Sequence, residues 1–224
     1  IGMKGTVGVT VDDIIYHTKH VVAGAPNTFV IGDMPFGSYN VSIEEAVKNA
    51  NRIFAEGGCD CIKLEGGTDM APVVKAIVKA GIPVCGHIGL TPQTSAMMGG
   101  FKVQGKSLEA AQALLDSARA LEEAGAFMIV LEGIPAMLAT EITKRISIPT
   151  MGIGAGAGCD MQVLVAQDML GMNDWVPKFV KKYADLRTTI LGAYNDYVKE
   201  ANERTFPAEA YQYNAKIEGL ENLK

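Results

Sequence analysis

The sequence predicts an α/β fold in which helices connect the strands of a parallel sheet. Short apolar runs alternate with longer amphipathic segments along 224 residues, 48% of which are hydrophobic. This pattern favours one large domain over two small ones. Three of the apolar runs end in an acidic residue, and in an α/β barrel the catalytic groups lie at that end of the strands.

The predicted strands alternate with predicted helices, which favours parallel pairing with helical crossovers. The six strands are expected over residues 29–33, 61–65, 83–87, 127–132, 149–154 and 162–166. An eight-stranded barrel typically needs about 250 residues. Residues 1–28 contain one helix-like segment and no clear strand, so two strands of such a barrel are expected to be absent.

The predicted helices begin and end at recognisable signals. Ser42 and Glu45 have the spacing of a capping box, and the helix that follows stops at Gly57. Apolar residues at helical spacing predict further helices over residues 70–80, 108–124, 136–145 and 178–203, the last being one helix or a broken pair. In that last segment, the residues spaced for burial are Phe179, Tyr183, Leu186, Ile190 and Tyr194. With no linker between elements, residues 1–224 are interpreted as one domain that includes a C-terminal helical segment over 178–224.

The composition argues against several classes of partner. The formal net charge is -5 and the 20 basic residues are scattered, so no basic stripe for nucleic acid and no polybasic membrane anchor is evident. No apolar stretch approaches the roughly 18 residues of a membrane span, and no secretion signal is recognisable. These observations indicate a small-molecule partner and a cytoplasmic location. The four cysteines lack zinc-site spacing and are interpreted as small buried thiols.

Asp33, Glu65 and Glu132 are the acids that end three predicted strands, and Lys63 precedes Glu65 by two residues. Residues two apart on a strand face the same side, so Lys63 and Glu65 either approach one site together or simply pair with each other. A single acid at a strand end is more often a helix cap or a surface residue. Three of them at one rim favour a site.

Two other features allow a structural and a functional interpretation. His87 could face the same site, but a buried and hydrogen-bonded core histidine is an equal alternative, so it is left outside the catalytic set. The glycines from Gly152 to Gly158 resemble a phosphate-binding loop, with Asp174 near the distance of the expected acid. We interpret them as a tight turn from a strand to a helix, where a ligand can approach the backbone.

Seven motifs, in this order, resemble those of ketopantoate hydroxymethyltransferases, and the resemblance spans about residues 1–183. They are Asp12-Asp-Ile-Ile-Tyr-His17-Thr, Gly32-Asp33-Met-Pro-Phe, Ile62-Lys63-Leu-Glu65-Gly-Gly, Cys85-Gly-His87-Ile-Gly-Leu-Thr-Pro-Gln93, Gly99-Gly-Phe-Lys-Val-Gln-Gly105, Val130-Leu-Glu132 and Gly152-Ile-Gly-Ala-Gly156. The resemblance implies a (βα)8 TIM barrel of the phosphoenolpyruvate and pyruvate superfamily. It also implies transfer of a hydroxymethyl group from 5,10-methylenetetrahydrofolate to 3-methyl-2-oxobutanoate, giving 2-dehydropantoate for pantothenate biosynthesis.

The resemblance further implies roles for individual residues. Asp33 and Glu65 match magnesium ligands, Asp33 and Lys63 match substrate-binding residues, and Glu132 matches the proton acceptor. Physical chemistry agrees, because a 2-oxo acid chelates Mg²⁺ and the resulting enolate is stabilised by the metal and by a nearby cation. The family resemblance also implies a homo-oligomer, commonly a decamer. The segment from Gly99 to Gly105 is expected to be either a mobile loop over the folate side or a plain surface loop.

The sequence departs from the family pattern at its beginning. About fifty residues and the first two strands, with an Asp-Ser pair that supplies a metal ligand, are expected to precede a stretch similar to Ile1-Gly-Met3. Val7-Gly8 replaces Leu-Pro, and Met161 replaces a common glycine. Two alternatives therefore stay open: a truncated non-catalytic assembly partner, and a related carbon–carbon lyase acting on a 2-oxo acid. The lyase families typically carry a cysteine motif after the lysine, which this sequence lacks.

Overall fold

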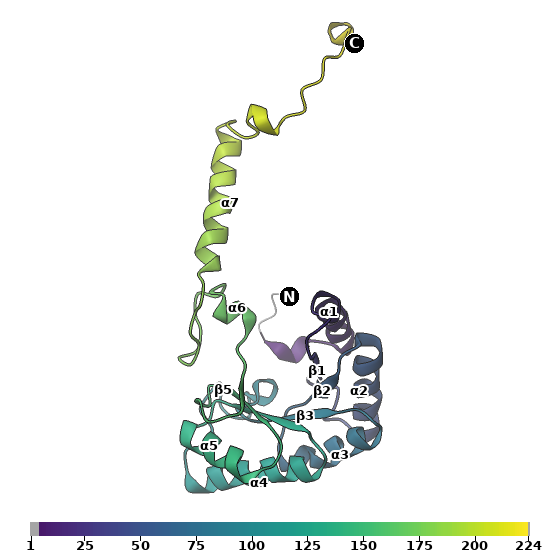
Figure 1. Ribbon diagram of the computed structural model, residues 1–224, viewed down its shortest axis with the longest axis vertical. Helices are drawn as coiled ribbons and strands as arrows, with labels where there is room; N and C mark the ends of the chain where they lie inside the picture. Colours follow the sequence, from purple (N-terminus) through teal and green to yellow (C-terminus); the bar gives the residue numbers. More distant parts are fainter. Residues whose placement is uncertain (1–4, 224) are drawn as a thin grey trace. The chain divides into compact units, whose positions relative to one another are not determined.

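A computed structural model describes residues 5–223 (Figure 1), so the expected junction at residues 1–3 lies outside the described part. The chain divides into two compact units between Val163 and Leu164, and each is described by itself. The interpretation of the whole chain as one domain, with 178–224 as its helical segment, stays a prediction.

The first unit contains one six-stranded parallel sheet whose strands follow the order of the sequence, β1-β2-β3-β4-β5-β6. The strands are β1 (Ile31–Asp33), β2 (Cys61–Lys63), β3 (Val84–Gly89), β4 (Met128–Glu132), β5 (Thr150–Ile153) and β6 (Met161–Gln162). All five pairings are parallel, with Asp33 opposite Lys63 and Gly89 opposite Glu132. The predicted number, order and direction of the strands are confirmed.

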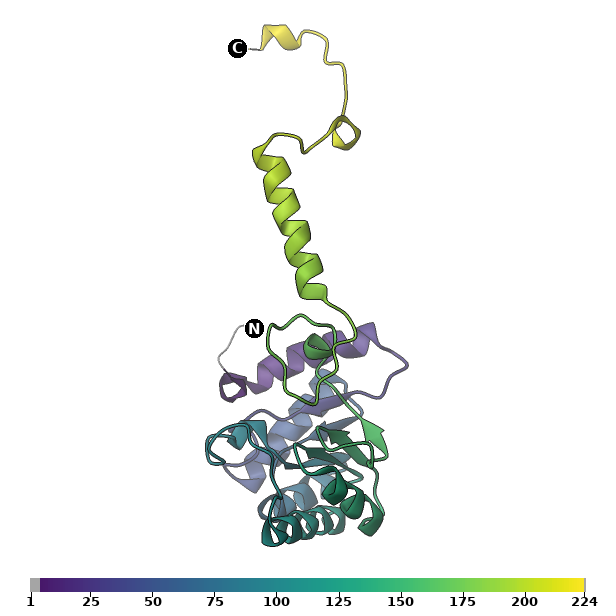
Figure 2. The same ribbon diagram turned by 90° about the vertical axis from the view of Figure 1, so that its left-hand side faces the viewer.

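The helices of this unit lie along one face of the sheet (Figures 1 and 2). Consecutive strands are neighbours in this sheet, and crossover connections between parallel strands are almost always right-handed. The connecting helices therefore lie on the same side of the sheet, as they do in an α/β barrel. The α-helices are α1 (Val11–Gly24), α2 (Ile43–Gly57), α3 (Ala71–Lys79), α4 (Leu108–Glu123) and α5 (Ala136–Arg145), and the 3-10 turns are η1 (Thr6–Gly8), η2 (Thr68–Met70) and η3 (Pro92–Thr94).

The starts of α2 and α4 follow from the sequence. Ser42 accepts a hydrogen bond from the backbone N–H of Glu45, and Ser107 accepts one from Ala110, so each serine satisfies an N–H that has no partner inside the helix. Gly58 then ends α2 at a φ of 76°, a left-handed conformation in which glycine carries no Cβ penalty.

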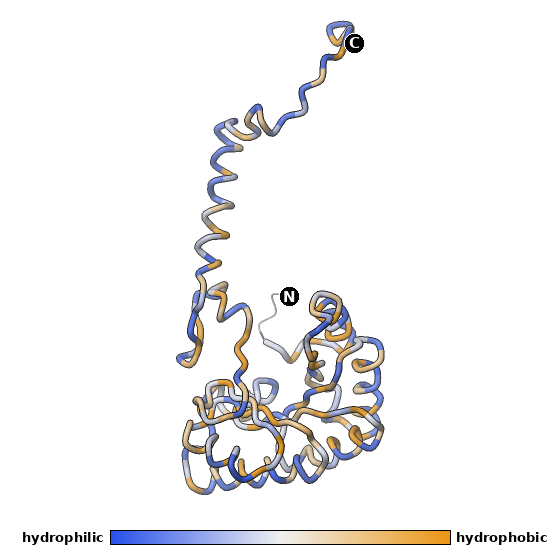
Figure 3. The backbone as a smooth tube through the Cα atoms, in the orientation of Figure 1, coloured by the Kyte–Doolittle hydropathy of each residue, from blue (hydrophilic) through white to orange (hydrophobic). Residues whose placement is uncertain are grey.

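Hydrophilic and hydrophobic residues alternate along the backbone of the first unit (Figure 3), and its buried apolar residues form two clusters. The face toward the helices is the larger apolar core, including Ile53, Ile62 and Ile129. The opposite face carries a smaller cluster formed by Cys61, Cys85, Met128, Val130 and Ile153. Side chains alternate between the two faces along a strand. A residue two or four positions after a member of this smaller cluster therefore points to the same face, nearer the carboxyl end of its strand.

The end of the sheet differs from the prediction. The strand predicted over 162–166 is reduced to β6, two residues that begin one position earlier. The glycine-rich segment after β5 leads directly to β6, with no helix between these two strands in the part of the chain described. The predicted turn from strand to helix is therefore wrong, because β6 pairs with β5 before any helix forms.

The second unit contains α6 (Ala166–Met169) and α7 (Leu186–Asn202), followed by the 3-10 turns η4 (Glu209–Tyr211) and η5 (Leu220–Asn222). The helix predicted from residue 178 begins eight residues later, where the side chain of Asp185 accepts a hydrogen bond from the backbone N–H of Thr188. The expected burial of its apolar residues is also wrong, because no residue of α7 is buried. Of the helices described, none is long and apolar enough to cross a membrane.

Candidate active site

The predicted site residues lie where parallel strands end. Asp33 is the last residue of β1, Lys63 the last of β2, and Glu132 the last of β4. Glu65 follows β2 by two residues and lies on the same side as Lys63. Adjacent parallel strands deliver their carboxyl ends to one edge, so positions far apart in the sequence meet here.

Lys63 joins two of the predicted acids. Its Nζ lies 2.9 Å from Asp33 Oδ1 and 3.3 Å from Glu65 Oε1. Burial by itself lowers the pKa of Lys63, but the charges of Asp33 and Glu65 and the hydrogen bonds to both outweigh it, so this pKa is raised. The side chain of Glu65 is only 3% exposed while that of Asp33 is 49% exposed. The ammonium group therefore stays charged and neutralises a buried carboxylate.

A second set of hydrogen bonds fixes Glu65 from behind. The backbone N–H of Gln93 donates to Glu65 Oε2 at 3.0 Å, and the side-chain amide of Gln93 donates to the carbonyl of Met34 at 2.9 Å. Tyr39 donates its hydroxyl to Gln93 Oε1 at 2.8 Å. Burial, followed by the charge of Glu65, raises the pKa of Tyr39. Gln93 thus holds Glu65 directly, while Tyr39 and Met34 hold the side chain of Gln93. Sequence reasoning identified neither Tyr39 nor Gln93 as a site residue.

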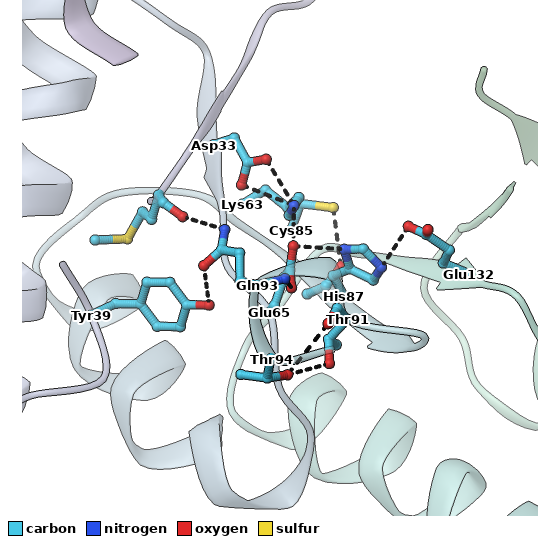
Figure 4. A network of polar contacts seen from close by, with 12 residues as sticks. Asp33, Tyr39, Lys63, Glu65, Cys85, His87, Thr91, Gln93, Thr94 and Glu132 are labelled. Atoms are coloured by element: carbon cyan, nitrogen blue, oxygen red, sulfur yellow. Dashed lines mark hydrogen bonds and ion pairs between the residues drawn. The ribbon is translucent and has the colours of Figure 1, made fainter. Parts of the chain in front are cut away.

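His87 lies between the Glu65 cluster and Glu132 (Figure 4). Its Nε2 is 3.2 Å from Glu132 Oε2, and its Nδ1 is 3.9 Å from Glu65 Oε1. The side chain is 4% exposed, yet neither ring nitrogen makes a hydrogen bond within the described residues. The alternative of a buried histidine is confirmed, but its hydrogen bonding is not. His87 lies two residues after Cys85 on β3. This spacing indicates that its side chain points to the same face of the sheet as Cys85, the face that carries the smaller cluster.

The smaller apolar cluster lies on the same face of the sheet as these polar groups. Cys61 and Cys85 are fully buried, and burial raises the pKa of Cys85 to about 12. Cys59 is buried as well, while Cys159 is partly exposed, and all four cysteines are free thiols. The interpretation of the cysteines as buried thiols is confirmed for the first three. Apolar surroundings strengthen the electrostatic interactions next to them, because the local dielectric constant is low.

The edge of the sheet carries oxygen donors of the kind that a divalent metal ion binds. Among residues 5–223, no group of three or more His, Cys, Asp or Glu side chains is placed to hold a metal. Asp33 and Glu65 nevertheless share one ammonium group, so their carboxylates lie close together. Mg²⁺ is usually held by one or two carboxylates, with water and substrate oxygens completing its octahedron. Asp33 and Glu65 are therefore the candidate donors for such an ion at this edge.

A cavity of about 370 Å³ adjoins this edge. Gly66, which follows Glu65, and Gly89, which pairs with Glu132, both line it. The remaining lining mixes apolar and polar side chains: Asp69, Ile88, Thr91, Thr94, Met97, Met98, Leu114 and Ser117, with the backbone of Gly67. Such mixed lining is typical of sites for small organic ligands.

Comparison with known proteins identifies related sequences along nearly the whole chain. A family model described as ketopantoate hydroxymethyltransferase matches residues 1–209, beyond the limit at residue 183 that the motifs indicate. A protein of Heliobacterium modesticaldum named 3-methyl-2-oxobutanoate hydroxymethyltransferase is 59% identical over 95% of this chain and 78% of its own length. A protein of the same name from Clostridium beijerinckii is 56% identical over 99% of this chain and 81% of its own length.

Solved structures share the fold at low sequence identity. A dihydrodipicolinate synthase from Bacillus anthracis aligns with a TM-score of 0.51 and 17% identity, covering 89% of this chain and 65% of that one. A phosphonopyruvate hydrolase aligns with a TM-score of 0.50 and 12% identity, covering 94% of this chain and 73% of that one. Likeness at this level concerns the α/β architecture alone.

Proposed function

The chain belongs to the ketopantoate hydroxymethyltransferase family, and from this premise we propose that it transfers a hydroxymethyl group to 3-methyl-2-oxobutanoate. The one-carbon donor is 5,10-methylenetetrahydrofolate, and the product is 2-dehydropantoate, a precursor of pantothenate. The observation that carries this proposal is the convergence of Lys63 with Asp33 and Glu65, beside Glu132, at the carboxyl edge of one sheet. An ammonium group and carboxylates suit an anionic keto acid that must lose a carbon-bound proton.

Glu132 is the proposed proton acceptor. Its carboxylate ends β4, is 13% exposed, and contacts His87 but no lysine or arginine in the part of the chain described. No ammonium or guanidinium group of the described residues therefore competes with a substrate proton for this carboxylate. In the proposed step, the proton on C3 of the keto acid moves to Glu132. The electron pair left on C3 then forms the bond to the methylene carbon of the folate, and both carbon–nitrogen bonds of that carbon break in the course of the transfer. Water supplies the hydroxyl oxygen of the product, and the two folate nitrogens take up the proton removed from C3 and one proton of the water.

Lys63 and Asp33 are the proposed substrate-binding residues. The raised pKa keeps Lys63 positively charged at neutral pH, so it can attract the carboxylate of the keto acid and offset the negative charge that develops on the keto oxygen. Asp33 is half exposed, so an incoming substrate can contact its carboxylate directly. Glu65 is buried, and its ion pair with Lys63 fixes the position of the ammonium group.

Asp33 and Glu65 are also the proposed ligands of Mg²⁺. When bound there, the ion would supply Lewis acidity toward the keto group of the substrate. The hydrogen bond from Gln93 to Glu65 Oε2 holds this carboxylate in a fixed direction, which limits the reorganisation needed for binding.

We assign the cavity beside Gly66 and Gly89 to the heterocyclic part of the folate co-substrate. Its methionine and leucine side chains suit the faces of a flat ring, and the Asp69 carboxylate and nearby hydroxyls suit its polar edges. Because Gly89 pairs with Glu132, a folate bound in this cavity would have its one-carbon unit near the proposed base.

The proposal extends to architecture and assembly. The sequential strand order and the helices on one face support a (βα)8 barrel of the phosphoenolpyruvate and pyruvate superfamily. We further propose that the protein acts in the cytoplasm as a homo-oligomer of decamer type. Light scattering on the purified protein measures this stoichiometry.

The test of function is an assay of the folded protein with 3-methyl-2-oxobutanoate, methylenetetrahydrofolate and Mg²⁺, followed by mass spectrometry. Formation of 2-dehydropantoate that requires the folate supports the proposal. Cleavage of the keto acid without folate would instead indicate a carbon–carbon lyase. Absence of turnover in protein that circular dichroism shows to be folded would indicate a non-catalytic assembly partner.

A further inference from the structure

His87 is a buried polar side chain to which the proposed mechanism gives no role. Both ring nitrogens have no hydrogen-bond partner within residues 5–223, although the side chain is 96% removed from solvent, its exposure being 4%. A buried polar group without a partner is rare and costly, because it has lost its bonds to water. Such a group at the edge of a candidate site indicates a partner that forms during function.

The nearest carboxylate oxygen to this ring is on the proposed base. His87 Nε2 lies 3.2 Å from Glu132 Oε2, which is within hydrogen-bond reach, but the two groups are not aligned as a hydrogen bond. Catalytic hydrogen bonds are often poorly aligned before substrate binds and tighten afterwards.

Within residues 5–223, Glu132 has no other side chain to orient it. Among the described residues, His87 is the one side chain that pairs with its carboxylate. Nδ1 of His87 lies 3.9 Å from Glu65 Oε1, too far for a direct hydrogen bond. The backbone around the ring is fixed, because β3 pairs with β4 over five residues, including His87 opposite Val130.

We propose that His87 is a positioning residue for Glu132: on binding of the keto acid, Nε2–H of His87 donates to Glu132 Oε2 and directs Oε1 toward the substrate proton. This inference rests on the proposed role of Glu132 as base. The strand fixes the ring, the ring fixes one carboxylate oxygen, and the second oxygen is left free to accept the proton. A misplaced reacting group costs up to about 100-fold in rate.

The test compares His87→Gln, whose amide nitrogen can occupy the place of Nε2, with His87→Leu, which has no donor. Exchange of the C3 proton of 3-methyl-2-oxobutanoate for deuterium, measured by NMR without folate, reports on the proton-transfer step separately from the one-carbon transfer. We expect His87→Leu to lower the exchange rate and kcat about 10- to 100-fold with KM within about twofold. His87→Gln should recover most of the rate, and His20→Gln on the exposed face of α1 should change nothing.

A structural role for His87 predicts a different pattern. Wild-type exchange in His87→Leu, or equal losses in the Leu and Gln variants, would overturn the inference. If the leucine variant does not fold, His87→Asn replaces it, because its amide nitrogen reaches the place of Nδ1 instead; equal activity of the Asn and Gln variants would then overturn the inference. Wild-type protein that neither exchanges the proton nor forms product refutes the proposed function itself, which keeps the two failures distinct.

Discussion

Lys63 and Glu65 form an ion pair across a spacing of only two residues, with Nζ 3.3 Å from Oε1. The strand places both side chains on its inner face, and Asp33 from β1 completes the cluster at 2.9 Å from the same nitrogen. The pairing that the sequence left as an alternative to a shared site therefore exists, and it belongs to the same cluster. The positive charge of Lys63 offsets the free-energy cost of burying the Glu65 carboxylate next to the smaller apolar cluster.

Lys63→Met should destabilise the protein and abolish turnover. Removal of the ammonium group leaves Glu65 buried without its counter-charge, and breaking a buried pair costs about 3 kcal/mol. Urea unfolding measures this loss, and Lys144→Met, which removes an exposed pair with Glu141, is the matched control with a change below about 0.5 kcal/mol. The double variant Lys63→Met with Glu65→Gln should regain stability but not activity. Equal stability of Lys63→Met and wild type would contradict the cluster as described.

Glu132→Gln should lower kcat by about 10²- to 10⁴-fold, which is the usual contribution of a general base. Glutamine preserves the size of the side chain and its contact with His87 but cannot accept the proton from C3. Steady-state kinetics and deuterium exchange should both show the loss, with KM little changed. The control is Glu141→Gln on the exposed face of α5. A fully active Glu132→Gln variant excludes this residue as the base.

Tyr39→Phe should lower stability by about 1–2 kcal/mol, because Gln93 Oε1 then lacks its 2.8 Å hydrogen bond in a buried position. The same change should loosen Gln93 and therefore the position of Glu65, raising KM for the keto acid more than it lowers kcat. Thermal unfolding and steady-state kinetics measure the two effects. Tyr194→Phe on α7, where the side chain is exposed, is expected to leave both unchanged, and an equal effect there would contradict this network.

Gly89→Ala should be far more damaging than Gly81→Ala. Both glycines have positive φ, 96° and 92°, so the alanine strain of about 1–2 kcal/mol is common to both. A Cβ at Gly89 would overlap the carbonyl oxygen of Glu132, whereas a Cβ at Gly81 meets nothing within 4 Å. We expect Gly89→Ala to displace the end of β4 and to abolish activity, while Gly81→Ala retains it. Comparable activity in the two variants would refute this steric argument.

The thiols should differ in their reaction with iodoacetamide at pH 8. Burial raises the pKa of Cys85 to about 12 from its ordinary value of 9.0, so almost no thiolate forms in the folded protein. Because the pKa of this thiol is higher in the folded than in the unfolded chain, the thiol stabilises the fold fully below about pH 9 and loses that contribution as the pH rises toward 12. Mass spectrometry should show Cys159 alkylated first, with Cys61 and Cys85 protected until urea unfolds the chain. Early labelling of Cys85 would contradict its burial.

The sequence located the helices α2, α4 and α5 closely, because their apolar spacing and caps are local signals. It predicted β6 and α7 poorly for the opposite reason. The end of β6 depends on how far pairing with β5 continues, and the start of α7 depends on which of several possible caps the chain uses. Asp185 is that cap, while the apolar pattern before it at Phe179 and Tyr183 continues without forming a helix.

The candidate site divides in the same way. Asp33, Lys63, Glu65 and Glu132 could be found from the sequence, since each stands at or just beyond the end of an apolar run and parallel strands bring such ends to one edge. Tyr39 and Gln93 could not, because their roles depend on hydrogen bonds between segments 54 residues apart. His87 could have been included from its spacing to Cys85, but the spacing predicts only the face and not the neighbour.

By itself, the sequence determined the α/β class, the order of six parallel strands and the edge at which the acids lie. These features follow from the periods of side chains along strands and helices, which are properties of the local chain. Only the tertiary structure decided that Lys63 lies between Asp33 and Glu65, and that His87 lies next to Glu132 without a hydrogen bond. Such contacts are set by the register of neighbouring strands and by packing, and neither is encoded in the spacing of any one segment.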